Sequence, residues 1–247
     1  MSPTELVIVG VVGFLLAILS GIAGGGGGFI MTPMLIFLGL SPAQAIATGK
    51  LGGLSMAIGS LAGMRPNRKL DKNILIVAII LSIISGFLAS KLIVGINEDI
   101  YGNILGVALI VIAPIMLIKK IGHQEKIISR NKKILGYIGL FVALFLQGIL
   151  SGGFGVFVSV VLMSGLGLNA IQSNITKRIT QLVLNSVIVL SLIGSGLILW
   201  NVALVMIIVN LLGSAIGGRI AVRKGSSFVS NVMAGLALFS GIALLVS

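Results

Sequence analysis

The sequence has almost none of the chemistry that an enzyme needs. Its 247 residues include no cysteine, one histidine and five acidic residues. The lack of cysteine excludes disulfides and thiolate metal sites, and the single histidine, His123, lies in a charged loop. Because these residues form neither a nucleophile–base pair nor a metal cluster, we expect no enzyme, no metal and no other cofactor.

Charged residues of either sign are also scarce. They make up 9% of the chain, against 57% hydrophobic residues and a mean hydropathy of +1.22, whereas soluble domains carry about 25% charged residues. The apolar runs are continuous rather than alternating, which favours helices over a membrane barrel. The sequence therefore predicts an all-α polytopic membrane protein.

The apolar segments fall into two sets of five. They lie near 4–21, 28–39, 42–63, 74–95 and 100–118, and then near 134–150, 154–167, 170–194, 198–217 and 228–246. The second segment of each set is too short to cross a hydrocarbon core about 30 Å thick, so we expect half-helices or re-entrant legs there. We divide the chain into an N-terminal repeat (1–118), a basic loop (119–133) and a C-terminal repeat (134–247).

Each half carries the same polar cassette within its apolar segments. The glycine-rich run 21–28 aligns with 148–155, and 39–51 aligns with 167–179 after one inserted residue. Thr48 and Lys50 then correspond to Thr176 and Arg178. Glycine-broken apolar segments at matching places in two halves are the best pointer in a sequence to a transporter's binding site.

The distribution of Lys and Arg predicts how the chain crosses the membrane. Three basic stretches should be cytoplasmic: Arg65, Arg68, Lys69 and Lys72; the loop 119–133; and Arg219, Arg223 and Lys224. Both termini, and the loop with Glu98 and Asp99, should then be external. The two halves have the same segment order but opposite charge placement, which predicts two inverted repeats of five segments each.

Three cations lie deep in these segments: Lys50 in the first half, and Lys177 and Arg178 in the second. A charge near the bilayer centre costs at least about 2.5–3.5 kcal/mol on insertion scales, so it marks a functional site by default. The acidic residues all belong to termini or loops: Glu5, Asp71, Glu98, Asp99 and Glu125. With no carboxylate at that depth, we expect a bound anion to be the partner of Lys50 and Arg178.

The candidate substrate-binding residues combine these cations with nearby polar residues and the glycine breaks. They are Gly25, Gly26, Gly27, Gly28, Gln44, Thr48, Lys50, Ser151, Gly152, Gly153, Gln172, Asn174, Thr176, Lys177 and Arg178. The glycines are included because the helix that starts after each break presents free N–H groups, which favour an anion. Gln181 and Asn185 are weaker candidates, since such amides also serve as helix–helix hydrogen bonds.

The cassettes resemble a known family. The glycine-rich break followed by Pro33, with Ala47-Thr48-Gly49-Lys50-Leu51 and Asn174-Ile175-Thr176-Lys177-Arg178, is similar to the sulfite exporter TauE/SafE family of membrane permeases. The resemblance covers both repeats, and it departs at Gly49, where a small polar residue is expected. It implies export of sulfite, sulfonates or related small organic or inorganic anions across the cell membrane.

The residues themselves predict a carrier of small anions that works by alternating access at a site between the two repeats. An anion channel lined by the same cations is the alternative. The expected partners are the anion and the lipid bilayer, not nucleic acid, and the oligomeric state, a homo-oligomer included, stays open. Since no acidic residue lies deep in a span, we expect the anion gradient and membrane potential to drive transport, or the substrate to carry its own proton, as hydrogen sulfite.

Overall fold

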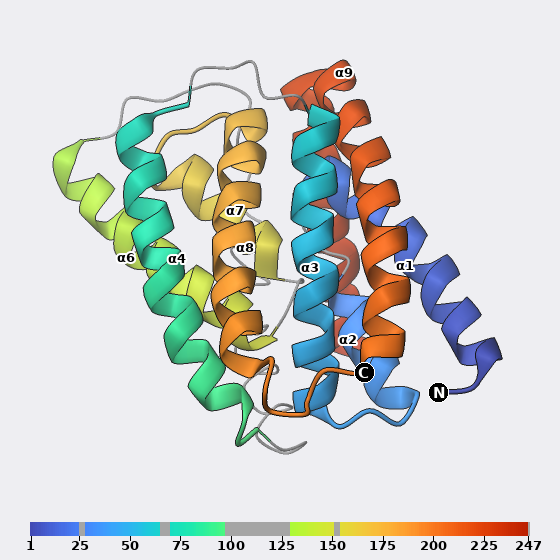
Figure 1. The fold of residues 1–247 in the computed structure, drawn as a ribbon. Coiled ribbons are helices and arrows are strands. Elements are labelled where there is room, and N and C mark those ends of the chain that lie inside the picture. Colours follow the sequence, from blue (N-terminus) through green and yellow to red (C-terminus); the bar gives the residue numbers. More distant parts are fainter. Residues whose placement is uncertain (25–27, 65–69, 97–128, 151–153, 247) are drawn as a thin grey trace.

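The computed structural model describes residues 1–24, 28–64, 70–96, 129–150 and 154–246. Within these ranges the chain forms helices joined by short turns, and no strand is present. Six of the described helices are long and apolar enough to cross a membrane. The predicted all-α polytopic architecture is therefore confirmed (Figure 1).

The first half contributes four described helices. They are α1 (Pro3–Ala23), α2 (Gly28–Phe37), α3 (Pro42–Met64) and α4 (Lys72–Ile93). Two of the acidic residues start helices, as expected for side chains outside the hydrocarbon: Glu5 forms a capping box with Ser2 before α1, and Asp71 caps α4. The predicted segment 100–118 and the basic residues 65–69 and 119–128 lie outside the described residues.

The second half contributes α6 (Arg130–Leu150), α7 (Gly155–Ser164), α8 (Ala170–Leu192) and α9 (Trp200–Val246). The helix α9 is interrupted at Gly225, where the backbone has φ 84° and ψ 178°. Only glycine adopts that conformation readily, so Gly225 separates the two segments that the sequence predicts near 198–217 and 228–246. The first of them runs further than predicted, to the basic residues just before Gly225.

The helices α2 and α7 are short, as the sequence predicts. Each has ten residues and is thus about 15 Å long, half of a hydrocarbon core of about 30 Å. Each is followed by a glycine with positive φ, Gly39 at 91° and Gly167 at 81°, which turns the chain into α3 or α8. The two halves therefore repeat the same unit of a long helix, a short helix and a second long helix.

The long helices exchange partners between the halves. The helices α3 and α8 lie side by side in the middle of the bundle (Figure 1). The helix α9 packs against α1 and α3, and α4 packs against α6 and α8. The fourth described helix of each half thus packs against the first and third helices of the other half. Both ends of the chain lie at the same end of the bundle (Figure 1).

Small residues allow the helices of the two halves to pack closely. A methyl group added to Gly63 of α3 would lie 2.1 Å from the carbonyl oxygen of Ala215 in α9, and one added to Gly21 of α1 would lie 2.7 Å from the carbonyl oxygen of Ser214. Backbones approach this closely in membranes because helix association there depends on packing rather than on the hydrophobic effect.

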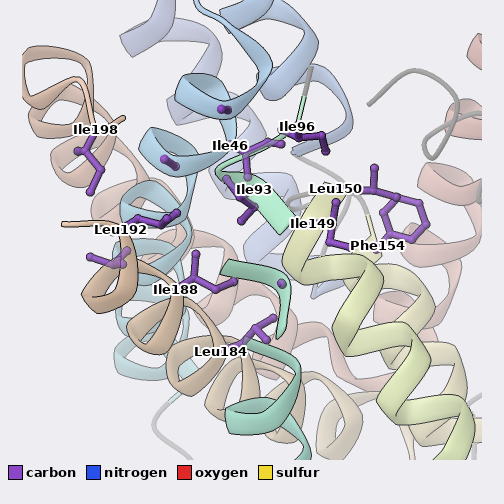
Figure 2. Close-up of a cluster of buried hydrophobic side chains, with 14 of the residues drawn as sticks. Ile46, Ile93, Ile96, Ile149, Leu150, Phe154, Leu184, Ile188, Leu192 and Ile198 are labelled. Carbon is purple, nitrogen blue, oxygen red and sulfur yellow. The ribbon is translucent and has the colours of Figure 1, made fainter. Parts of the chain in front are cut away.

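The apolar side chains divide into a packed interior and an outer surface. Figure 2 shows one interior cluster, in which Ile46, Ile93, Leu150 and Leu184 come from four different helices. The outer surface is also apolar, with exposed side chains that include Val7, Ile76, Leu135, Leu190 and Leu204. A surface of this kind is suited to lipid, since soluble proteins rarely expose large contiguous apolar patches.

Candidate substrate-binding site

A polar cavity lies inside the bundle, among α1, α2, α3, α6, α8 and α9. The space open to the centres of water molecules measures about 50 Å³, enough for about three to five waters or a small oxyanion. It is lined by Gly13, Leu16, Ser20, Met31, Thr32, Gly49, Lys50, Gly53, Met56, Gln147, Lys177, Gln181, Asn185, Met206 and Asn210. Among the described residues, no carboxylate lines it, so its formal charge comes from lysine alone.

Lys50 is buried beside the end of a helix from the other half. Its side chain is 2% exposed, and its Nζ donates a 2.8 Å hydrogen bond to the backbone oxygen of Gln147. Gln147 is in the last turn of α6, where carbonyls lack partners within the helix and form the negative end of its dipole. The ammonium group therefore has partial charge compensation from the protein.

Arg178 makes the equivalent contact in the opposite direction. Its side chain is fully buried and donates to the backbone oxygen of Ser20, to Ser20 Oγ at 3.3 Å and to Gln181 Oε1 at 3.0 Å. Ser20 is in the last turn of α1 and directly precedes the first glycine run, as Gln147 precedes the second. Lys50 and Arg178 thus have neutral hydrogen-bonding partners within the protein, and the bound anion expected as their counter-ion stays a prediction.

Lys177 differs from these two cations. It is 1% exposed and lines the cavity, and its ammonium group makes no hydrogen bond to any part of the chain that the structure describes. A methyl group on Gly155, the first residue of α7, would lie 2.5 Å from Lys177 Nζ, and α7 has no side-chain cap. Lys177, which has no hydrogen-bonding partner among the described residues, therefore lies beside the positive end of a helix, where an anion is favoured.

The repeat explains why the site is asymmetric. Lys177 aligns with Gly49, and both line the cavity. One half therefore supplies a cation at this position while the other half supplies no side chain. Gly49 is also the position where the chain departs from the resemblance noted above. With glycine at position 49, the first half adds no side-chain hydrogen-bond donor to the cavity at the position that corresponds to Lys177.

Asn174 and Thr176 are buried on α8 but do not belong to the cavity lining. Asn174 Nδ2 donates to the backbone oxygen of Ile22 at 2.9 Å and to that of Gly21 at 3.5 Å. Its Oδ1 is buried against Gly24, whose φ is 75°, and has no partner in the described part of the chain. Asn174 therefore holds the end of α1 in the structure.

Three other predicted residues have local structural roles. Thr48 Oγ1 accepts a 3.0 Å hydrogen bond from the backbone N–H of Leu199, just before α9. Gln44 pairs reciprocally with Ser41 before α3, and Gln172 pairs in the same way with Asn169 before α8. These are capping boxes, so part of the similarity between the cassettes reflects how each half starts its central helix.

The predicted glycines are only partly described. Gly25, Gly26, Gly27, Ser151, Gly152 and Gly153 lie outside the described residues, and Gly28 is the first residue of α2. Of the candidate residues predicted from sequence, Lys50 and Lys177 line the cavity, as do the weaker candidates Gln181 and Asn185.

Four polar residues of the lining are absent from the predictions: Ser20, Thr32, Gln147 and Asn210. Ser20 and Gln147 could have been found, because they extend the aligned glycine runs by one residue in the N-terminal direction. Asn210 is an isolated amide in an apolar span, which is a weak signal. Thr32 carries no signal of its own, since a hydroxyl is common inside membrane helices.

A helical membrane bundle with a polar, cation-bearing interior cavity has the architecture of a membrane transporter. The sequence model of the family described as "Sulfite exporter TauE/SafE" matches residues 9–244, and the chain belongs to this family. The predicted family resemblance is thereby confirmed.

Two curated relatives are also described as transporters. The chain is 27% identical over 230 residues to a "Probable membrane transporter protein" of Haemophilus influenzae, covering 91% of this chain and 88% of the relative. It is 24% identical over 234 residues to the "Probable membrane transporter protein YfcA" of Escherichia coli strain K12, covering 93% and 85% respectively. No solved structure matches the chain at a significant level.

Proposed function

We propose that the protein is a carrier for small anions, most suitably sulfite, sulfonates or related sulfur oxyanions and organic acids. The observation that carries this proposal is Lys177, a buried cation without a hydrogen-bonding partner among the described residues, in a polar cavity that those residues line without a carboxylate. A buried charge of this kind is expensive unless it is paired. The cavity is therefore most stable when an anion occupies it.

In this proposal the site residues have distinct roles. The ammonium group of Lys177 supplies the main attraction, and the amide groups of Gln181 and Asn185 supply directional donors to the anion's oxygens. Lys50 contributes a further positive charge at the cavity wall while it keeps its bond to α6. The methionines of the lining, Met31, Met56 and Met206, form a flexible apolar wall that can adapt to small differences in substrate shape.

Transport would follow from movement of the two halves around this cavity. The exchange of α4 and α9 between the halves supports a two-fold relation between inverted repeats, and the position of both chain ends at one end of the bundle supports termini on the same side of the cell membrane. The anion gradient and membrane potential drive the cycle, or the substrate brings its own proton.

Binding to the purified protein tests the proposal. Calorimetry with sulfite, thiosulfate, methanesulfonate and acetate should give an affinity that falls at least about tenfold in Lys177→Gln. Lys91→Gln is the matched control, because Lys91 is an exposed cation at the end of α4 that lies 4.6 Å from the Phe87 ring. Equal affinity in both variants would refute the site.

Flux in proteoliposomes distinguishes the carrier from an anion channel. A carrier saturates with anion concentration because each transport cycle needs one binding event. Unsaturable flux with single-channel currents would instead assign the cavity to a channel.

A further inference from the structure

We propose that Lys50 and Arg178 are tethered counter-cations, which occupy the place that a coupling metal ion takes in other transporters with broken helices. The inference rests on the proposed carrier function and concerns which cations the transport cycle needs. Transport by this protein should accordingly require neither Na⁺ nor K⁺.

Positive charge is needed at the C-terminal ends of α1 and α6. Both helices end at a glycine-rich break, where the last carbonyls of a helix are short of partners within it, although the carbonyl of Ser20 still accepts the N–H of Gly24. At membrane depth such carbonyls need a partner from the protein or from a wet cavity, and they carry the negative end of the helix dipole. In transporters with broken helices, such carbonyls coordinate the driving cation.

Here the chain itself supplies positive charge at both ends. Lys50 Nζ binds the backbone oxygen of Gln147 at the end of α6, and Arg178 binds that of Ser20 at the end of α1. Each cation is on the central helix of one half, and each acceptor is on the first helix of the other half. The residues correspond pairwise in the repeat, so the same solution is used twice.

The groups around Lys50 and Arg178 indicate that these side chains act through their charge and not only by filling space. The carbonyls of Gly21 and Ile22 at the end of α1 accept hydrogen bonds from the neutral amide of Asn174. Gln147 Oε1 is buried and has no partner among the described residues. Loss of the Lys50 ammonium group would therefore remove the charged donor from the Gln147 carbonyl beside a second buried oxygen, an environment that attracts a small cation.

The first test is the ion dependence of the unmodified protein. Uptake of radiolabelled sulfite into proteoliposomes, with choline, Na⁺ or K⁺ as the only bulk cation on both sides, should agree within about twofold, because no external cation is needed. A loss of uptake when Na⁺ or K⁺ is replaced by choline overturns the proposal.

The second test creates a vacant cation site. In detergent, Lys50→Ala should melt at a lower temperature than the unmodified protein, and millimolar methylammonium or Na⁺ should raise the melting temperature of the variant and leave that of the unmodified protein unchanged. In Arg178→Ala, millimolar guanidinium should do the same. Lys91→Ala is the control that should respond to none of these ions. If neither Lys50→Ala nor Arg178→Ala responds to its matching cation, the tethered-cation role is refuted.

The melting experiment needs no substrate, so it separates the two proposals. If the unmodified protein neither binds nor transports sulfite or the other anions but the variants are rescued as described, the carrier proposal fails and the counter-cation role stands. Lys50→Arg supplies a variant that keeps the charge, and it should show no rescue by methylammonium. A Lys50→Arg variant that still required added cation would contradict the inference.

Discussion

The two central helices carry aligned cassettes that share a glutamine, a threonine and an outer cation but differ at the residue between the threonine and the cation. Thr48-Gly49-Lys50 on α3 aligns with Thr176-Lys177-Arg178 on α8. The outer cations bind the ends of α6 and α1, in mirrored contacts. The middle residue is a cation only on α8, and there it lines the cavity. The duplicated cations thus connect the two halves, and the unduplicated cation is the one that our proposal assigns to the anion.

The amide side chains also differ between positions that are duplicated in the repeat and positions that are not. The paired glutamines Gln44 and Gln172 belong to capping boxes at equivalent helix starts. Asn185, Gln181 and Asn210 lack an equivalent amide in the other half, and they line the cavity. The three amides that lack an equivalent in the other half thus line the cavity, whereas the two paired glutamines start the central helices.

The largest expected effect follows removal of a mirrored cation. Arg178→Met should lower stability by about 2–6 kcal/mol, because Ser20 Oγ and Gln181 Oε1 lose their buried donor and each unsatisfied buried acceptor costs about 1–3 kcal/mol. Thermal unfolding of the purified protein measures the change. A variant as stable as the unmodified protein would show that the contact between α8 and α1 contributes little.

Substitution of Lys177, the cation without a counterpart in the first half, should raise stability instead of lowering it. Lys177→Met should weaken anion binding by about 2–3 kcal/mol, since a charge-assisted hydrogen bond is lost. In the absence of anion its melting temperature should rise, because an uncompensated buried charge is removed. Calorimetry and thermal unfolding on the same preparation provide both readouts. A fall in stability without anion would place Lys177 among the structural cations.

A smaller effect is expected at Thr48. Thr48→Val should cost about 1 kcal/mol of stability, since the N–H of Leu199 loses its acceptor, and it should leave anion affinity within about twofold of normal. Thr48→Ser is the matched control because it keeps the hydroxyl. A binding defect in Thr48→Val that Thr48→Ser does not share would restore the role in substrate binding that the sequence predicts.

The smallest effects belong to the capping glutamines. Gln44→Ala and Gln172→Ala should each cost about 0.5–1 kcal/mol of stability and be additive, because the two caps are at separate helix starts. Anion affinity in the double variant should match that of the unmodified protein. A loss of binding in either single variant would instead return that glutamine to the site.

Much of the fold could be predicted from local pattern. Continuous apolar runs gave the long helices, and the short runs after the glycine breaks gave α2 and α7, because helix length follows from the number of apolar residues. The main difference is at Gly225, where the first part of α9 extends past the predicted end. Charged residues there suggested a loop, but long basic side chains are tolerated at a helix end near the membrane surface.

The site was less accessible from sequence. The depth of Lys50, Lys177 and Arg178 was apparent, yet their partners were not. Lys50 and Gln147 lie 97 positions apart, and Arg178 and Ser20 lie 158 apart. A carboxylate partner is visible in a sequence, whereas the acceptors here are backbone carbonyls, which every residue has and no sequence pattern identifies.

The sequence by itself determined the membrane-spanning class, the family, the duplicated cassette and the presence of three buried cations. These are consequences of composition and of local order along the chain. Only the tertiary structure decided which of these cations has a hydrogen-bonding partner among the described residues, because that depends on whether a helix end from the other half reaches it. A hydrogen bond acts over about 3 Å, and only the packing of α3 and α8 against the ends of α6 and α1 brings those atoms within that range.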